Sequence, residues 1–298
     1  MRIYRHCGGL TEEVGDFGLA LGVFDGVHLG HQAVLDAARG FSRLGILTFD
    51  PHPVQILAPE RAPRRILAGL EHKKLIFERL GVDFMVVMEF TPEFASREAR
   101  DFANELFSCE ASRLAAGGDW SFGKGRQGTM TKLAEWAQGT SVEVVEVGAV
   151  TLAGERISST RIRELLKGNN LEGAAALLGR PYSVFGEVVK GRQLGRTIGF
   201  PTANVAVQDE QLLPNGVYLI EGNGMPGVAN IGTRPTVNDS GQRSLEVHLF
   251  SDEIPMEYGW KLEVGFLRKL REEQKFESVE QLTGQIARDV EEAHRLLS

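Results

Sequence analysis

The spacing of apolar residues changes near residue 180, and this change constrains the fold more than any other feature of the chain. Before it, short apolar runs alternate with segments that have apolar residues at helical spacing. The runs are residues 17–24, 46–49, 84–88, 113–116 and 142–147, and the helical segments include 70–80, 96–106 and 131–137. Strands that alternate with helices predict a Rossmann-like domain, a mostly parallel sheet with helices on both faces. Two short helices are expected next, ended by Gly168 and Gly179.

After residue 180 the apolar residues follow a period of two, and Gly, Pro and Asn separate the runs. The runs are residues 182–190, 216–222, 226–232, 244–250 and 260–267. Closely spaced strands of this kind predict a small antiparallel barrel or sandwich. Ser278 and Gln281 form a capping-box pattern at the start of a last helix. A chain of 298 residues has room for two domains, which we expect at 1–180 and 181–298.

Composition excludes several classes of protein. The chain carries 33 basic and 40 acidic residues, a net charge of −7, which argues against a broad nucleic-acid surface. It contains no apolar run long enough for a membrane span or a signal peptide, so we expect a cytoplasmic protein without a membrane partner. Cys7 and Cys109 are too few for a disulfide scaffold or a zinc site, and we expect two free thiols without a role in a reducing compartment.

The first strand-to-helix junction, GVFDGVHLGH (22–31), is the most informative motif. Its glycines allow backbone to approach a ligand closely, and a helix N-terminus presents unpaired amides to anions. His28 and His31 could both face one phosphate and neutralise charge on an α-phosphate and its pyrophosphate leaving group. A structural role for the histidines stays open, and so does a metal pair, although no third ligand is close in sequence.

Residues 118–128 carry two weaker patterns. GKGRQG (123–128) matches the dinucleotide fingerprint, and Glu143 lies about 20 residues on, but the match is far from the first strand-to-helix junction. Gly118 to Lys124 has the spacing of a phosphate-binding P-loop. Gly125 then occupies the position where a Ser or Thr should hold magnesium. We therefore predict neither a dinucleotide site nor a P-loop in this segment.

Together with TFDPHP (48–53) and ISSTRIR (157–163), the first junction resembles the nucleotidylyltransferase superfamily, specifically the bacterial bifunctional riboflavin kinase/FAD synthetase family. The resemblance implies that His28, His31 and Arg161 are catalytic. The implied ATP-binding residues of this domain are Gly22, Phe24, Asp25, Gly30, Ser159 and Thr160. Without the resemblance, Ser158 to Thr160 would be interpreted as helix N-caps and Arg161 as a surface charge.

GDWSFGKGRQG (118–128) resembles the loop that contacts the flavin in that family. The resemblance implies flavin contacts from Asp119 and Phe122, and from Asp50 and His52 of the second motif. Trp120 stands where the family usually has Phe. A glycine-rich surface loop is the alternative.

KGRQLGRTIGFPTAN (190–204) resembles the riboflavin kinase motif that ends in P-T-A-N. Thr202 and Asn204 share one face of an extended segment, and their oxygens suit Mg²⁺ accompanied by nucleotide phosphates. The implied ATP-binding residues of the kinase are Lys190, Gly191, Gly195, Gly199 and Pro201. In isolation the segment could also be a Pro-Thr-Asn turn.

SLEVHLF (244–250) has Leu245, Val247 and Leu249 on one face, with Glu246 and His248 on the other. Glu246 is the candidate general base for a substrate hydroxyl, with an exposed edge carboxylate as the alternative. In FLRKLREEQKF (266–276), Arg268 and Arg271 are expected one helical turn apart, either near the flavin or solvated.

The family resemblance implies that the C-terminal domain phosphorylates riboflavin to FMN, and that the N-terminal domain joins FMN to ATP to give FAD and pyrophosphate. The implied partners are these small molecules with Mg²⁺, and we expect a monomer or a weak homo-oligomer. Three alternatives stay open: a nucleotidylyltransferase for another substrate, a chain with one active domain, and a non-catalytic flavin sensor. The P-T-A-N segment of the second domain favours a flavin substrate over the substrates of other nucleotidylyltransferases.

Overall fold

The structure, a computed structural model, describes residues 1–8, 10–60, 65–191, 199–233, 243–251 and 257–298. Contacts within the chain divide it into two compact units. The first contains Met1–Arg64 and Lys73–Ser159, and the second contains Arg65–His72 and Thr160–Ser298. This division differs from the predicted boundary at 180/181, because the two helices before residue 180 group with the second unit.

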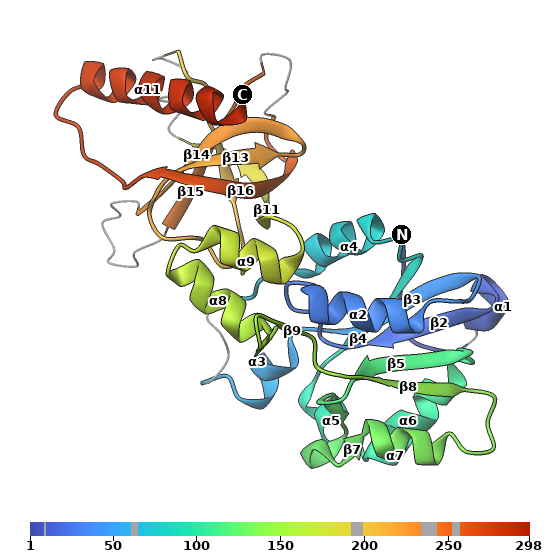
Figure 1. The fold of residues 1–298 in the computed structure, drawn as a ribbon. Helices are drawn as coiled ribbons and strands as arrows, with labels where there is room; N and C mark the ends of the chain where they lie inside the picture. The colour runs from blue at the N-terminus through green and yellow to red at the C-terminus, as the bar shows by residue number, and fades with distance from the viewer. Residues whose placement is uncertain (9, 61–64, 192–198, 234–242, 252–256) are drawn as a thin grey trace. The chain divides into compact units, whose positions relative to one another are not determined.

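A six-stranded sheet forms the centre of the first unit (Figure 1). Its order is β1 (Arg2–Tyr4), β4 (Phe84–Glu89), β3 (Arg43–Asp50), β2 (Phe17–Leu21), β5 (Arg113–Gly117) and β8 (Glu143–Val147). Every neighbouring pair is parallel, which confirms the predicted sheet. All five residues of β2 are buried, as expected for a strand covered on both faces.

Helices cover both faces of this sheet. The helices of this unit are α1 (Leu10–Val14), α2 (Leu29–Ala38), α3 (Pro53–Leu57), α5 (Pro92–Ala95), α6 (Ala99–Ser108) and α7 (Met130–Trp136), together with α4 (Leu70–Arg79), which begins in the segment Arg65–His72 of the second unit. Phe17, Leu19 and Leu21 of β2 share a core cluster with residues of α6 and α7. The opposite face of β2 meets α2 so closely that a Cβ atom at Gly18 would overlap the carbonyl oxygen of Ala38. Successive strand side chains point to opposite faces, so both faces are packed.

Several short elements were not predicted. β6 (Ser121–Phe122) pairs with β7 (Gly128–Thr129) around a 3₁₀ turn at Lys124–Arg126, and β9 (Thr151–Leu152) pairs with β10 (Glu155–Arg156). Two-residue strands carry no detectable period. The G-x-G-x-x-G string at 123–128 thus runs from the turn after β6 to the first residue of β7. It does not follow a strand of the main sheet, where a dinucleotide fingerprint operates.

The prediction of two free thiols is wrong, because a disulfide joins Cys7 to Cys109. Both side chains are buried in the same core cluster as β2. They are 102 residues apart in sequence, so only the packing of the sheet and its helices brings them together.

The second unit contains a closed barrel of six antiparallel strands, which decides between the predicted barrel and sandwich. Its order is β11 (Tyr182–Val189), β12 (Ala203–Ala206), β15 (Arg243–Leu249), β14 (Met225–Thr233), β13 (Gly216–Gly222) and β16 (Lys261–Arg271). Helices α8 (Ser159–Lys167) and α9 (Leu171–Leu178) precede it. Gly179 ends α9 in the left-handed conformation as expected, but after α8 the left-handed residue is Asn169 rather than Gly168.

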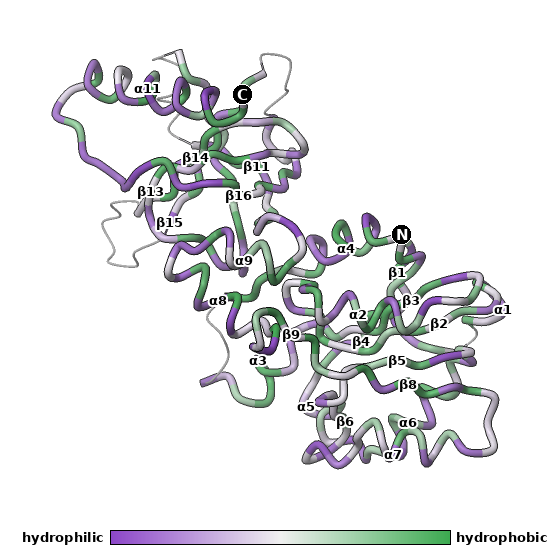
Figure 2. Tube along the Cα trace, viewed as in Figure 1, coloured by the Kyte–Doolittle hydropathy of each residue, from purple (hydrophilic) through white to green (hydrophobic). Residues whose placement is uncertain are grey.

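A last helix, α11 (Val279–Leu297), packs against the barrel (Figure 1). It begins as predicted, because the Ser278 hydroxyl accepts from the Gln281 amide. Its buried residue Ala293 packs with Leu219 and Val228 of the barrel. Figure 2 shows α11 alternating between polar and apolar residues, whereas the central strands of the parallel sheet are mostly apolar. No helix in the part of the chain that the structure describes is long and apolar enough to cross a membrane.

Arg268 and Arg271 are not one helical turn apart, and that prediction is wrong. Both lie on β16, which pairs with β13 as far as Arg271. Arg271 makes a bidentate ion pair with Asp289 of α11, with its Nη2 at 2.7 Å from a carboxylate oxygen, while Arg268 is exposed. This ion pair therefore links α11 to strand β16 of the barrel.

Candidate functional site

The loop between β2 and α2 contains two strained residues. Phe24 (φ 54°) and Val27 (φ 45°) adopt left-handed backbone conformations without being glycine, and such residues concentrate at functional sites. β2 has β3 on one side and β5 on the other. The loop thus follows the strand at which the order of the sheet reverses, which is where open α/β sheets bind ligands.

His28 and His31 lie together at the start of α2. Their rings are stacked with centroids 3.6 Å apart and planes 14° from parallel. His28 is the N-cap, and its Nδ1 accepts from the His31 amide at 3.3 Å, which leaves the proton of a neutral ring on Nε2. The two histidines therefore lie side by side at a helix N-terminus, and their catalytic role stays a prediction.

His31 has an open hydrogen-bonding position. Its Nδ1 is buried and has no hydrogen-bond partner among the residues that the structure describes. Burial lowers the pKa of His31 well below its ordinary value, and the charges of His28 and Lys73 lower it further. A neutral, buried imidazole with an unsatisfied nitrogen fits a ligand atom at this position.

Side chains from four other positions fix the backbone of this loop by donating to its carbonyl oxygens. The donors are Ser159 Oγ to Asp25 (2.8 Å), Gln32 Nε2 to Val27 (3.1 Å), and Thr48 Oγ1 and Lys73 Nζ to Val23 (3.2 and 3.3 Å). Ser159, which the resemblance assigns to ATP, thus holds the loop. The sequence did not predict a role for Gln32, Thr48 or Lys73. Of these, only Thr48 lies within one of the motifs, TFDPHP (48–53).

Small residues leave room for the rings of this site. A Cβ atom at Gly30 would lie 3.1 Å from the His28 ring, and one at Gly22 would lie 3.0 Å from the Phe24 ring. Phe24 is buried and packs edge-on against His31 at 5.4 Å. Thr160 and Arg161 follow in α8 and belong to the second unit, so their action beside the histidines stays a prediction.

The predicted flavin residues of the first unit occupy separate elements. Asp50 is exposed at the end of β3, before a cis peptide bond to Pro51, and His52 is the N-cap of α3. Asp119 forms an ion pair with Arg156 at 2.6 Å, and both side chains are largely exposed. These three positions stay predictions as flavin contacts.

Phe122 is a core residue in this structure. Its side chain is 7% exposed and packs with Phe102, Trp120 and Trp136. Trp120, where the family usually has Phe, is only half-buried and lies 4.8 Å from Phe122 between ring centroids. Trp120 is therefore the more accessible aromatic ring of this loop.

In the barrel, the candidate metal ligand and the candidate base are direct cross-strand partners. Asn204 of β12 pairs with Glu246 of β15, and Glu246 pairs on its other side with Asn230 of β14. Paired residues of an antiparallel sheet project to the same face, with Cβ atoms about 4.5–5.5 Å apart. The three side chains therefore form one polar row, of which Asn230 was missed. Leu245, Val247 and Leu249 are buried on the opposite face, as predicted.

The P-T-A-N segment is held from two sides. A Cβ atom at Gly191 would overlap the side-chain amide of Asn204, so the start of the preceding loop lies directly against the candidate ligand. His248 Nδ1–H donates to the carbonyl oxygen of Pro201 at 2.8 Å. Thr202 is half-buried, two residues before Asn204.

The other kinase residues implied by the resemblance are placed only in part. Lys190 is exposed beside Gly191, and Gly199 has a left-handed backbone (φ 84°). Gly195 lies outside the described residues.

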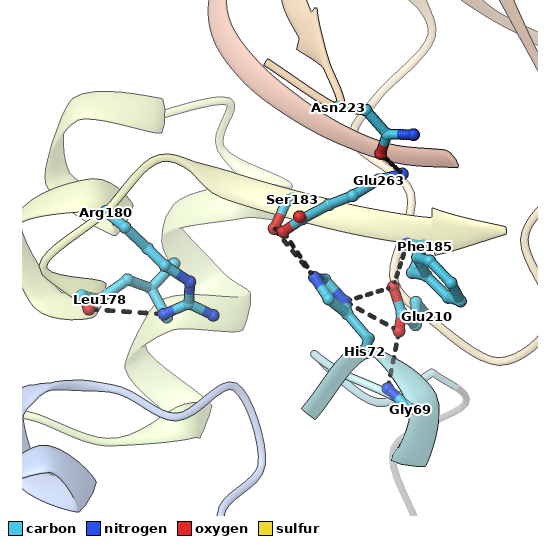
Figure 3. Close-up of polar contacts among 9 residues, drawn as sticks. All are labelled: Gly69, His72, Leu178, Arg180, Ser183, Phe185, Glu210, Asn223 and Glu263. Carbon is cyan, nitrogen blue, oxygen red and sulfur yellow. Dashed lines mark hydrogen bonds and ion pairs between the residues drawn. The ribbon is translucent and has the colours of Figure 1, made fainter. Parts of the chain in front are cut away.

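Figure 3 shows a second polar cluster of the second unit, centred on His72. His72 is 1% exposed and lies between Glu210, at 3.0 Å from its Nδ1, and Glu263, at 3.1 Å from its Nε2. Burial by itself would lower the pKa of His72, but hydrogen bonds to the two carboxylates, and their charges, raise it above the ordinary value. The two carboxylates therefore favour the protonated form of His72.

Further donors stabilise the two carboxylates. Glu210 accepts from the amides of Gly69 and Phe185, and Glu263 accepts from the Ser183 hydroxyl (Figure 3). Buried charges are tolerated when they are paired and hydrogen-bonded in this way. The cluster ties the segment Arg65–His72 to the barrel, and no local sequence signal could have predicted it.

Comparison with known proteins agrees with the fold of both units. Residues 11–161 match the family model of FAD synthetase, and residues 178–297 match that of riboflavin kinase. A Listeria monocytogenes protein named bifunctional riboflavin kinase/FMN adenylyltransferase is 40% identical, over 96% of this chain and 95% of its own. The chain belongs to that bifunctional family.

An Escherichia coli member of the riboflavin kinase/FMN adenylyltransferase family is 39% identical, over 91% of this chain and 90% of its own. A solved structure from Streptococcus pneumoniae, titled a macrolide-efflux protein, covers 99% of both chains with a TM-score of 0.80 and 28% identity. The order of the two family models along the chain confirms the predicted order of the two domains.

Proposed function

We infer that this family member phosphorylates riboflavin to FMN in its second unit and adenylylates FMN to FAD in its first, with ATP as the donor in both steps. The observation that carries this inference is the match of the two halves, in order, to FAD synthetase and riboflavin kinase. The functional domains are then 1–180 and 181–298, although part of the kinase scaffold comes from residues 65–72.

In adenylyl transfer, a phosphate oxygen of FMN attacks the α-phosphorus of ATP, and the bond to the leaving pyrophosphate breaks. The stacked histidines suit this step because Nε2–H of His28 can donate to a phosphate oxygen, and the open Nδ1 of His31 can accept a proton as negative charge arrives. Arg161 supplies further positive charge. Positioning and charge stabilisation carry the step, without a covalent intermediate.

In the kinase step, Glu246 takes the proton from the ribityl hydroxyl of riboflavin as the hydroxyl oxygen attacks the γ-phosphorus of ATP, and ADP leaves. The cross-strand pairing with Asn204 supports this role, because it places the base beside the residues that would bind the nucleotide. The proposed contacts to the ATP phosphates in the kinase are Lys190, Gly191, Gly199 and Pro201.

Thr202 and Asn204 would hold Mg²⁺ in the kinase. Their hydroxyl and amide oxygens are hard, neutral donors, so the donor set fits a magnesium ion whose remaining ligands are phosphate oxygens and water. When bound, the ion would neutralise charge on the phosphates.

Dependence on ATP favours the cytoplasm, and we propose a monomer or a weak homo-oligomer there. Asp50, His52, Asp119 and Phe122 remain the proposed flavin contacts of the first unit, and Trp120, whose ring lies beside that of Phe122, is added to them. Arg268 and Arg271 remain the proposed flavin contacts of the kinase, and Arg271 also makes the ion pair with Asp289.

A chromatographic time course with riboflavin, ATP and Mg²⁺ tests the function. FMN should appear first and FAD should follow. FMN alone would mean that the first unit is inactive or takes another substrate, and no product even with FMN supplied would exclude both activities. His28→Ala should abolish FAD while FMN accumulates, and Glu246→Gln should slow FMN formation by about 10²–10⁴-fold. With FMN supplied for the FAD assay, equal loss of both activities in either variant would contradict the separate sites.

A further inference from the structure

A buried lysine that the proposed reaction does not use, Lys73, lies against the loop that carries the two histidines. Its side chain is 7% exposed, and Nζ donates to the carbonyl oxygen of Val23 at 3.3 Å. Burial lowers the pKa of Lys73, while the charges of Asp25 and Asp50 oppose that shift. An apolar side chain could fill similar volume without the cost of burying an ammonium group, so the charge itself needs an explanation.

The carbonyl that Lys73 holds directly precedes the strained part of the loop. Phe24 is left-handed, and a strained residue of this kind persists only where the surrounding structure fixes it. Thr48 Oγ1 donates to the same carbonyl oxygen at 3.2 Å. Phe77, one turn after Lys73 on α4, packs its ring edge-on against Phe24 at 5.4 Å. Helix α4 and strand β3 therefore fix the backbone at Val23 and the ring at Phe24 together.

The ring of Phe24 in turn contacts the pair of histidines. Phe24 packs edge-on against His31 at 5.4 Å, and His31 stacks on His28 at 3.6 Å. A rotation of the peptide between Val23 and Phe24 would move the Phe24 ring and remove the surface against which His31 rests. The position of both imidazoles thus depends on the two hydrogen bonds to one carbonyl oxygen.

We propose that Lys73 is a positioning residue of adenylyl transfer, which acts with Thr48 to hold the Val23 carbonyl and so orients His31 and His28. The proposal rests on the proposed FMN adenylyltransferase activity of the first unit. The ammonium has a second effect, because its charge adds to burial and to the charge of His28 in keeping His31 neutral before ATP binds.

Lys73→Met tests the proposal, since it keeps a similar volume without the donor or the charge. FAD formation is measured with FMN supplied, and FMN formation from riboflavin is measured in the same preparation. We expect kcat for FAD to fall about a hundredfold, the scale of a misplacement near 1 Å, with smaller changes in KM and unchanged FMN formation. Lys74→Met, on the next position of the same helix and only half-buried, is the matched control and should behave as the wild type.

Nuclear magnetic resonance titration of His31 distinguishes positioning from a merely structural role. Lys73→Met should raise the pKa of His31, because one of the positive charges that lower it is removed, and Lys73→Arg should restore part of kcat. If Lys73→Met does not fold, Thr48→Val decides, with an expected loss of about three- to tenfold in kcat for FAD. Wild-type kcat in Lys73→Met, or in Thr48→Val where the first variant does not fold, would overturn the proposal. Failure of the wild type to make FAD from supplied FMN would instead refute the proposed function.

Discussion

His72 and Lys73 are adjacent on α4, yet their side chains are buried in different compact units. His72 binds carboxylates of the unit that contains the barrel, and Lys73 binds the loop that carries the candidate adenylyltransferase histidines. Neighbouring side chains of a helix project about 100° apart, so two adjacent residues can be buried among different residues. The boundary between the two units therefore falls within α4, between the buried residues His72 and Lys73.

The His72 cluster predicts how the stability of the barrel depends on pH. The pKa of His72 is raised in the folded protein, so its contribution is complete below the unfolded value of about 6.5 and is lost as the pH rises through the folded pKa. Urea unfolding of the barrel can be followed by Trp260 fluorescence after Trp120→Phe and Trp136→Phe remove the tryptophans of the other unit. The free energy of unfolding should decrease as the pH rises above 6.5.

In the same background, His72→Gln should cost about 3–5 kcal/mol at low pH, because Glu210 and Glu263 are left buried without their cation. Its unfolding should lose the pH dependence described above. His294→Gln, an exposed histidine of α11, is the matched control and should leave the profile unchanged. A profile that His72→Gln does not alter would contradict a charged His72.

A fragment of residues 160–298 should be less stable than the barrel in the full chain, because it lacks the segment that supplies His72. It also loses the bridge between Ile66 and Glu210 and the backbone donor Gly69. The urea midpoint from Trp260 fluorescence measures the loss. Replacing Glu210 and Glu263 by Gln in the fragment should recover part of it, since neutral amides tolerate burial without a cation. Equal midpoints for the fragment and the full chain would show that residues 65–72 are dispensable.

Gly191→Ala should reduce riboflavin kinase activity by about a hundredfold, because the added Cβ would overlap the Asn204 amide and displace a proposed magnesium ligand. FAD formation from supplied FMN should be unchanged. Gly284→Ala in α11, where the nearest atom to an added Cβ is 3.8 Å away, is the matched control and should keep full kinase activity. A Gly191→Ala variant with a normal magnesium titration and normal turnover would remove Asn204 from metal binding.

What the sequence predicted were the features that depend on local periodicity and on motifs. The parallel strands, the barrel strands and the alternation of Leu245 with Glu246 all follow from spacing within a few residues. The placement of His28 and His31 at one helix start follows from their three-residue spacing, whereas the stacking of their rings was not predicted.

The missed features depend on contacts between distant segments. Cys7 meets Cys109 across 102 residues, and His72 meets Glu263 across 191. The charged run after Phe266 suggests a helix by composition, but pairing of β16 with β13 extends the strand to Arg271. Lys73 has the sequence context of any lysine on an amphipathic helix, and only the fold shows that it is buried against Val23.

Binding of ATP to the first unit should take up a proton. The pKa of His31 is lowered in the free protein, so the ring is largely neutral near pH 6.5, and the negative charge of a triphosphate favours its protonated form. Calorimetry with a non-hydrolysable ATP analogue, in buffers of different ionisation enthalpy, measures the uptake. The kinase site binds the analogue in both the wild type and His31→Asn, so the difference between them reports on His31. The wild type should take up more protons than His31→Asn, and equal uptake would show that His31 does not titrate against the phosphates.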